Sequence, residues 1–176
     1  MDTIVWILIL LTAFNFLLKQ TFWKPVAVGA AAGIAAIFVI LMWPYAIEQS
    51  KTQIADWLSD NQLMLDTSVV LTLEIVLQMA FCLLAVHVAN YSPVKNRMML
   101  AYRLLYWFPG VLIIPVLFFG LTQAVFSFPG VSFKLIAWFF GAFVFVIIPL
   151  GRWLIKWLLP EEDLRLELFF LTNALV

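Results

Sequence analysis

The chain has 176 residues, of which 65% are hydrophobic and only 11% are charged. A soluble domain is nearer half apolar and a quarter charged, so this composition excludes an ordinary water-soluble protein. Ten basic and ten acidic residues give no net charge, and the basic patch of a nucleic-acid-binding protein is missing. The single cysteine, Cys82, excludes an internal disulfide. We therefore expect an all-α polytopic membrane protein with one transmembrane domain over residues 1–176.

The apolar runs locate the expected membrane-spanning helices. A complete crossing needs about 20 residues, and the runs predict five full spans followed by a partial sixth helix. No positive charge precedes the first run, so we interpret it as an uncleaved helix rather than a signal peptide. The expected spans are about 4–18, 25–47, 67–90, 101–126, 132–158 and, in part, 164–176.

Local residue types predict several helix ends. Pro25 suits the first position of the second helix, and residues 66–68 (Asp-Thr-Ser) suit the N-cap of the third. Residues 109–110 (Pro-Gly) and Pro115 predict kinks in the fourth helix. Residues 129–130 (Pro-Gly) predict a type II turn, so the fourth and fifth helices should form an antiparallel hairpin.

The C-terminal segment begins with a proline and three acids. Pro160 suits a first helical position, and the acids that follow suit the positive end of the helix dipole. Arg165 lies four residues after Glu161, a favourable helical pair. The 13 helical residues from Leu164 to Val176 extend only about 20 Å. Either a sixth helix continues beyond Val176, or the segment is a half-span that contacts a partner.

The distribution of basic residues predicts the orientation. Eight of the ten lie in loops on one side of the expected membrane, and only Lys51 and Lys134 lie on the other. Because basic loops stay in the cytoplasm, we expect the N-terminus outside a bacterial inner membrane. In the outer loop, residues 54–65 predict a short amphipathic helix on the membrane surface, with a docking surface for a periplasmic partner as the alternative. The eight basic residues are Lys19, Lys24, Lys95, Arg97, Arg103, Arg152, Lys156 and Arg165.

Glu74 is the most conspicuous candidate functional residue. It lies about eight residues into the third helix, and ionisable residues inside a membrane are functional candidates. Gln78 is four residues later and shares the same helix face. One interpretation is a proton or cation site; the other is a neutral, hydrogen-bonded acid that fixes helix packing. We favour the packing role, because a transport path needs several such residues and the other helices offer little beyond Gln123.

His87 lies thirteen residues after Glu74, about 220° around the same helix. The two side chains should therefore face nearly opposite ways. A bis-histidine haem site within the chain is excluded, because His87 is the only histidine. We expect an interfacial, hydrogen-bonded histidine and no cofactor. A haem or metal ligand, completed by Met79 or by a partner's group, is the alternative.

The second helix contains a G-x-x-x-G pattern at Gly29 and Gly33. Small residues at this spacing let another helix approach closely. We favour packing within the chain over homodimerisation, although such a face also suits the docking of one subunit onto another. The chain lacks the G-x-S-x-G, H-E-x-x-H and P-loop motifs, so we expect no enzymatic activity.

Two stretches, VHVANYSPVKNRMMLAYRLLYW at 86–107 and LPEEDLRLELFFLTNALV at 159–176, carry a family resemblance. They resemble the small hydrophobic membrane subunits of haem-utilisation (Hmu) operons of Bacteroidota, neighbours of ExbB/TolQ-type proton channels. The resemblance implies an accessory subunit of an energised inner-membrane complex for haem or TonB-dependent uptake. Its partners would be an ExbB/ExbD-type motor or a haem-handling protein.

These observations together predict a non-catalytic subunit of a larger membrane complex. Polar residues are too sparse for chemistry, and the short soluble segments leave no room for a catalytic domain. The alternative is a small proton- or cation-coupled transporter or channel that uses Glu74. The expected cytoplasmic docking residues are Lys95, Arg97, Arg103 and Arg165.

Overall fold

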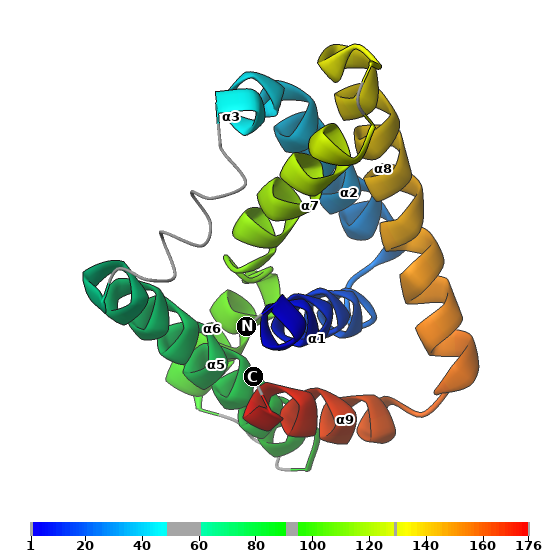
Figure 1. The fold of residues 1–176 in the computed structure, drawn as a ribbon. Helices are drawn as coiled ribbons and strands as arrows, with labels where there is room; N and C mark the ends of the chain where they lie inside the picture. The colour runs from blue at the N-terminus through cyan, green and yellow to red at the C-terminus, as the bar shows by residue number, and fades with distance from the viewer. Residues whose placement is uncertain (1, 49–60, 91–94, 129, 176) are drawn as a thin grey trace.

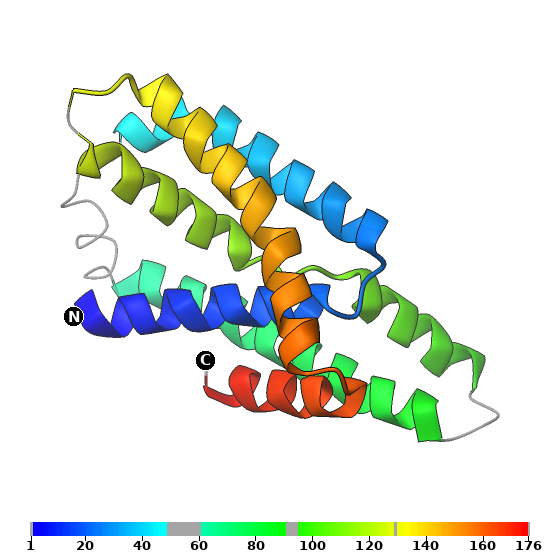
Figure 2. The ribbon, with the colours of Figure 1, turned by 90° about the vertical axis from the view of Figure 1, so that its right-hand side faces the viewer.

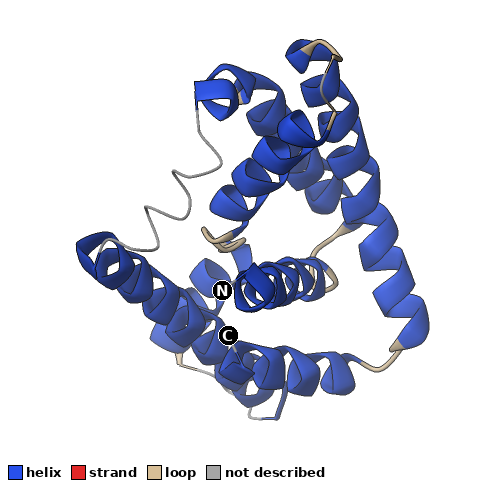
Figure 3. Ribbon diagram, in the orientation of Figure 1, coloured by secondary structure: helices blue, strands red, loops and turns tan. Residues whose placement is uncertain are grey.

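The computed structural model describes residues 2–48, 61–90, 95–128 and 130–175. Over these ranges every regular element is helical, as expected for an all-α protein (Figure 3). The helices are α1 (Asp2–Gln20), α2 (Pro25–Leu41), α3 (Trp43–Glu48), α5 (Asn61–Asn90), α6 (Asn96–Trp107), α7 (Ile113–Ser127), α8 (Phe133–Leu158) and α9 (Glu162–Leu175).

Two of the described helical segments are long and apolar enough to cross a membrane. They are Ser68–Asn90 within α5 and the whole of α8. The other strongly apolar helices are shorter: Trp6–Gln20 in α1, α2 and α7. The all-α class is therefore confirmed, whereas the length of the helices does not confirm five full spans.

The expected fourth span, 101–126, is two separate helices. The chain leaves helical geometry after Trp107 and resumes it at Ile113, and Gly110 between them has a φ of 96°. Pro109 has no N–H to donate, and a positive φ suits only glycine well, so the pair ends α6 rather than merely bending it. We call residues 108–112 the helix break. The second expected span is likewise divided, between α2 and α3.

Other helix ends also differ from the sequence predictions. Because α5 begins at Asn61, the expected cap at residues 66–68 lies inside the helix. The last helix begins at Glu162 rather than at Pro160, with two acids in its first turn as the helix dipole favours. Before α8, Gly130 has a φ of 95° and the Val131 N–H donates to the Phe128 carbonyl at 3.4 Å, two features that the turn predicted here requires. Most of the outer helix predicted at 54–65 lies outside the described residues.

The helices pack into two groups on either side of α1, which Figure 1 shows nearly end-on at the centre. One group contains α2, α3, α7 and α8, and its most extensive contact joins α2 to α8. We call it the apolar half. A Cβ added to Gly141 of α8 would lie 2.8 Å from Cγ1 of Ile40 on α2, so this close crossing requires glycine.

The second group contains α5, α6 and α9, which pack together beside α1. The apolar centre between this group and α1 includes Leu18, Phe81 and Phe169, all at most 1% exposed. We call this group, together with α1 and the helix break, the polar half, because most of the buried polar side chains belong to it. Figure 2 shows α1 and α9 running side by side in opposite directions.

Candidate functional site: a buried acid at a helix break

Glu74 binds the start of α7. Its side chain is 4% exposed, and its Oε2 accepts hydrogen bonds from the backbone N–H groups of Val111 at 2.7 Å and Leu112 at 2.8 Å. The first N–H groups of a helix have no partner within it. A carboxylate at that end also interacts favourably with the helix dipole. Glu74 therefore caps α7 from a different helix.

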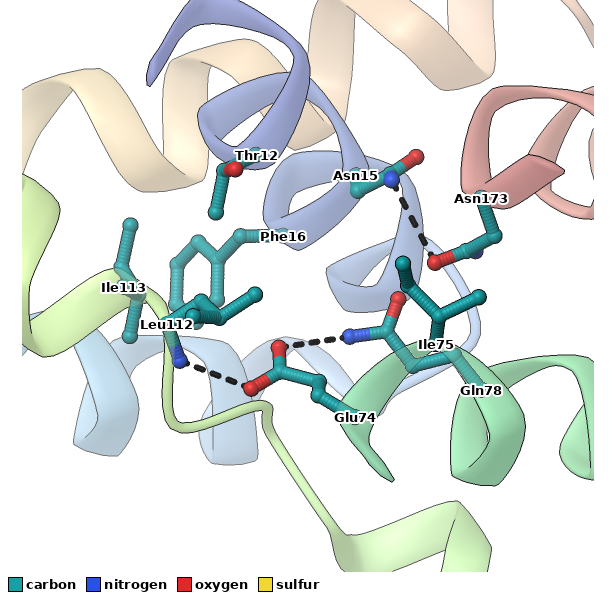
Figure 4. A pocket seen from close by; sticks show the side chains of 9 residues that line it. All are labelled: Thr12, Asn15, Phe16, Glu74, Ile75, Gln78, Leu112, Ile113 and Asn173. Carbon is teal, nitrogen blue, oxygen red and sulfur yellow. Dashed lines mark hydrogen bonds between the residues drawn. The ribbon is translucent and has the colours of Figure 1, made fainter. Parts of the chain in front are cut away.

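Gln78 holds the other oxygen of the same carboxylate. Its Nε2 donates to Oε1 of Glu74 at 2.8 Å, as their shared face on α5 allows (Figure 4). Gln78 is itself only 5% exposed. The carboxylate is thus fixed by three neutral donors, two from the backbone of the helix break and one from its own helix.

Gly110 of the helix break leaves room for the acid. A Cβ at this position would lie 2.6 Å from Oε1 of Glu74, and the φ of 96° disfavours any other residue. Glycine therefore serves two purposes here, since it permits the turn and lets the backbone approach the carboxylate. The sequence predicted a kink at this position but not the contact with Glu74.

A buried lysine binds the opposite side of the helix break. Lys19 of α1 is 1% exposed, and its Nζ donates to the Leu105 carbonyl at 3.0 Å. The same Nζ lies 3.0 Å from the ring centroid of Phe81, a cation–π contact. Nε1 of Trp23 donates to the Tyr106 carbonyl at 2.7 Å. Cations suit the carbonyl end of a helix, so Lys19 caps the end of α6.

The helix break is therefore bounded by two buried side chains of opposite charge. Glu74 binds the amide end of α7, and Lys19 binds the carbonyl end of α6. Sequence reasoning assigned Lys19 to a cytoplasmic loop. The sequence carries one signal for this position: Asn15 and Lys19 are four residues apart, so on a helix they share one face. In the structure that face of α1 is turned inward, and both side chains are buried.

Two arginines expected in cytoplasmic loops also bind helix ends. Arg152 donates from Nε to the Gln20 carbonyl at 3.2 Å and from Nη2 to the Trp23 carbonyl at 3.0 Å, at the end of α1. Arg165, expected at a docking surface, is only 6% exposed. Its Nη1 donates to the carbonyls of Leu159 at 2.7 Å and Pro160 at 2.8 Å, because the end of α8 leaves carbonyls that need donors.

A small polar cavity of about 10 Å³ adjoins Glu74. Asn15 donates from Nδ2 to Oδ1 of Asn173 at 3.3 Å, and Asn173 donates in turn to the Phe169 carbonyl at 2.7 Å (Figure 4). The sequence did not lead us to Asn173. The one feature that could have indicated it is a polar amide side chain within an otherwise apolar segment. The lining residues are Thr12, Asn15, Phe16, Glu74, Ile75, Gln78, Leu112, Ile113 and Asn173.

The remaining predicted site residues lie apart from Glu74. A Cβ added to Gly29 or Gly33 would meet no described atom within 4 Å, and both glycines are half-buried. His87 is half-buried in the last turn of α5. Three expected docking residues are exposed on or beside α6, namely Lys95, Arg97 and Arg103. Among the described residues, no three His, Cys, Asp or Glu side chains are grouped as metal ligands.

No family model, curated protein or solved structure matches the chain. Its function is inferred from the contacts of its own residues.

Proposed function

We propose that the chain is a non-catalytic integral subunit of a larger complex in a bacterial inner membrane. The observation that carries this proposal is the edge of the buried face of α2, where Gly29 and Gly33 are half-buried and a Cβ added to either would meet no atom within 4 Å. The adjoining buried face of α2 is occupied within the molecule, since Ala32 and Val39 are 0% exposed. Small residues with open space beside them suit the close approach of a helix from another protein.

The use of the buried polar groups supports the same proposal. Glu74, Lys19 and Arg165 each bind backbone groups at helix ends of their own chain. In a membrane such backbone groups find no water, so capping them stabilises the fold. Groups engaged in this way position helices rather than attack a substrate. The proposal therefore assigns no enzymatic step to the chain.

The exposed side chains fit a protein surrounded by lipid and other subunits. Ile34, Phe139 and Trp157 are each at least 69% exposed, although all three are large and apolar. We assign the exposed basic residues of α6 to the cytoplasmic side, following the positive-inside rule, and propose them as a docking surface. The proposed partner, suggested by the resemblance of 86–107 and 159–176, is an ExbB/ExbD-type motor or a haem-handling protein.

A second candidate function is a small proton- or cation-coupled transporter that uses Glu74. The helix break favours it, because many transporters bind their substrates where membrane helices are discontinuous. The single acid and the small volume of the adjoining cavity make this the weaker candidate. Transport abolished by Glu74→Gln in liposomes that contain only the purified chain would reverse this order.

The subunit proposal is tested by purification from the native membrane in a mild detergent, followed by mass spectrometry. We expect a stoichiometric membrane partner, and we expect Gly29→Ile with Gly33→Ile to release it without lowering the Tm. A Cβ at either position would meet no atom of the described chain within 4 Å. Gly141→Ile is the matched control, because it should lower the Tm by disturbing the internal α2–α8 contact. Recovery of the chain only as a monomer in several mild detergents would contradict the proposal.

A further inference from the structure

The last two turns of α8 carry two cations on one face. Arg152 and Lys156 are four residues apart, so their side chains are neighbours on the helix surface, and both are half-buried. Figure 2 shows that α8 crosses the end of α1 before the chain turns into α9. There Nε and Nη2 of Arg152 donate to two carbonyls of α1 and the turn after it. Nη1 of Arg152 and Nζ of Lys156 are left as donors without an acceptor among the described residues.

A third cation, Arg165, is fixed beside this pair. Its Nη1 binds two carbonyls at the end of α8, and its guanidinium carbon lies 5.9 Å from the ring centroid of Phe22, in the same turn that Arg152 binds. Lys156 lies within electrostatic range of both arginines. We call Arg152, Lys156 and Arg165 the cationic corner. Three like charges held close together repel one another, and an anion placed among them would relieve that repulsion.

The acids nearby do not neutralise the cationic corner. Glu162, in the first turn of α9, is the acid within electrostatic range of Lys156. Its side chain is exposed, as are those of Glu161 and Asp163 beside it. Within the described ranges no acid forms an ion pair with any of the three cations. Three cations against one acid leave an excess of positive charge at the end of α8.

Exposed apolar side chains surround the same two turns of α8. Trp153 and Trp157 are 61% and 69% exposed, and Leu154 and Leu158 are 50% and 68% exposed. Tryptophan is enriched where the headgroups of a bilayer meet its hydrocarbon region. Since α8 is long and apolar enough to cross a membrane, its end lies at the depth of the headgroups in the membrane arrangement proposed above.

We propose that the cationic corner binds the phosphate group of an anionic phospholipid. Nη1 of Arg152 and Nζ of Lys156 donate to the phosphate oxygens, and Arg165 adds a fixed positive charge. A lipid suits the site better than a soluble phosphate does, because the free donors and the exposed apolar side chains belong to the same two turns of α8. The inference rests on the membrane location in the proposed function, but it needs no partner subunit.

The test is native mass spectrometry of the purified chain in a maltoside detergent, with phosphatidylglycerol or phosphatidylcholine added in steps. Both lipids contain a phosphodiester, but the choline group of phosphatidylcholine cancels its charge. We expect the first molecule of phosphatidylglycerol to bind about tenfold more tightly than the first molecule of phosphatidylcholine.

Lys156→Gln is the decisive variant. Lys156 makes no hydrogen bond within the described chain, so its loss uncaps no helix end. We expect the affinity for phosphatidylglycerol to fall about fivefold and the affinity for phosphatidylcholine to stay the same. Arg97→Gln, which removes an exposed cation of α6, is the matched control and should change neither affinity. Glu162→Gln removes the competing acid and should tighten the binding of phosphatidylglycerol about twofold.

The outcomes separate a lipid site from the alternatives. Weaker binding of phosphatidylglycerol in Lys156→Gln, with unchanged binding in Arg97→Gln, would support the proposal. Equal affinities for the two lipids, or equal weakening by both substitutions, would contradict it. Inorganic phosphate is then added at constant ionic strength. Displacement of bound phosphatidylglycerol by this ion would identify a soluble phosphate as the ligand and would contradict the assignment to a lipid. The copurification of a partner tests the subunit role separately.

Discussion

Around α2 and α8 the fully buried side chains are apolar, whereas around α1, α5 and α9 they include an acid, a lysine and several amides. The apolar half depends on shape, as the contact of Gly141 with Ile40 shows. The polar half depends on pairing, as the contacts of Glu74 and Lys19 with the two sides of the helix break show.

The difference follows from the continuity of the helices. A continuous helix such as α8 satisfies nearly all of its own backbone, with one hydrogen bond lost at Pro149, so its neighbours need mainly to fit its surface. A helix interrupted inside a membrane exposes amides at one end and carbonyls at the other, and no water is present to bind them. Side chains must replace the water. The burial of Glu74 and Lys19 is therefore a consequence of the break between α6 and α7, whereas the buried Arg165 binds the carbonyls at the end of α8.

The largest expected effect comes from Glu74→Leu. This substitution leaves the N–H groups of Val111 and Leu112 buried without an acceptor, which costs about 4 kcal/mol in the free energy of unfolding. Glu74→Gln keeps an acceptor oxygen and should cost less than half as much. Chemical denaturation in detergent measures both values. Equal losses for the two variants would show that capping of α7 is not what Glu74 contributes.

A smaller effect is expected in the apolar half from Gly141→Ala. The added Cβ would lie 2.8 Å from Ile40 Cγ1 and 3.3 Å from the Ala36 carbonyl oxygen, so α2 and α8 must separate slightly. Overpacking of this kind costs about 2 kcal/mol in the free energy of unfolding. Gly33→Ala is the control that should cost nothing, because its Cβ meets no atom within 4 Å. Similar losses at both positions would contradict the described packing of α2.

The smallest effect is expected from Lys19→Met. The substitution removes the bond to the Leu105 carbonyl and the cation–π contact with Phe81, but it also removes the cost of burying an ammonium group. We expect a net loss of about 1 kcal/mol in the free energy of unfolding. Lys24→Met, at an exposed position, is the matched control. A Lys19→Met variant more stable than the unmodified chain would show that Lys19 is buried at a net cost.

Much of the fold is predictable from the sequence, because it depends on local pattern. The apolar runs predict an all-helical chain, and residues 129–130 predict the turn before α8. The extent of the break at residues 108–112 is not predictable, since Pro109 and Gly110 are compatible with either a kink or a full interruption. The outcome depends on whether other helices supply partners for the exposed backbone groups.

The candidate site is predictable only in part. Glu74 and Gln78 are visible as polar residues four positions apart in an apolar run. Their partners are not visible, because Val111 and Leu112 contribute backbone atoms rather than recognisable side chains. Lys19 was assigned to a loop because a basic residue after an apolar run is typical of a cytoplasmic boundary. Its burial becomes apparent only when Phe81 is brought beside it.

The role of Glu74 as the cap of α7 is tested most directly by amide hydrogen exchange at Val111 and Leu112. Both amides bind the Glu74 carboxylate, so they should be protected in the unmodified chain and nearly as well protected in Glu74→Gln. In Glu74→Leu we expect exchange at these two positions to be about 100-fold faster, while amides in the centre of α8 keep their protection. Exchange of Val111 and Leu112 at the same rate in all three proteins would contradict the account.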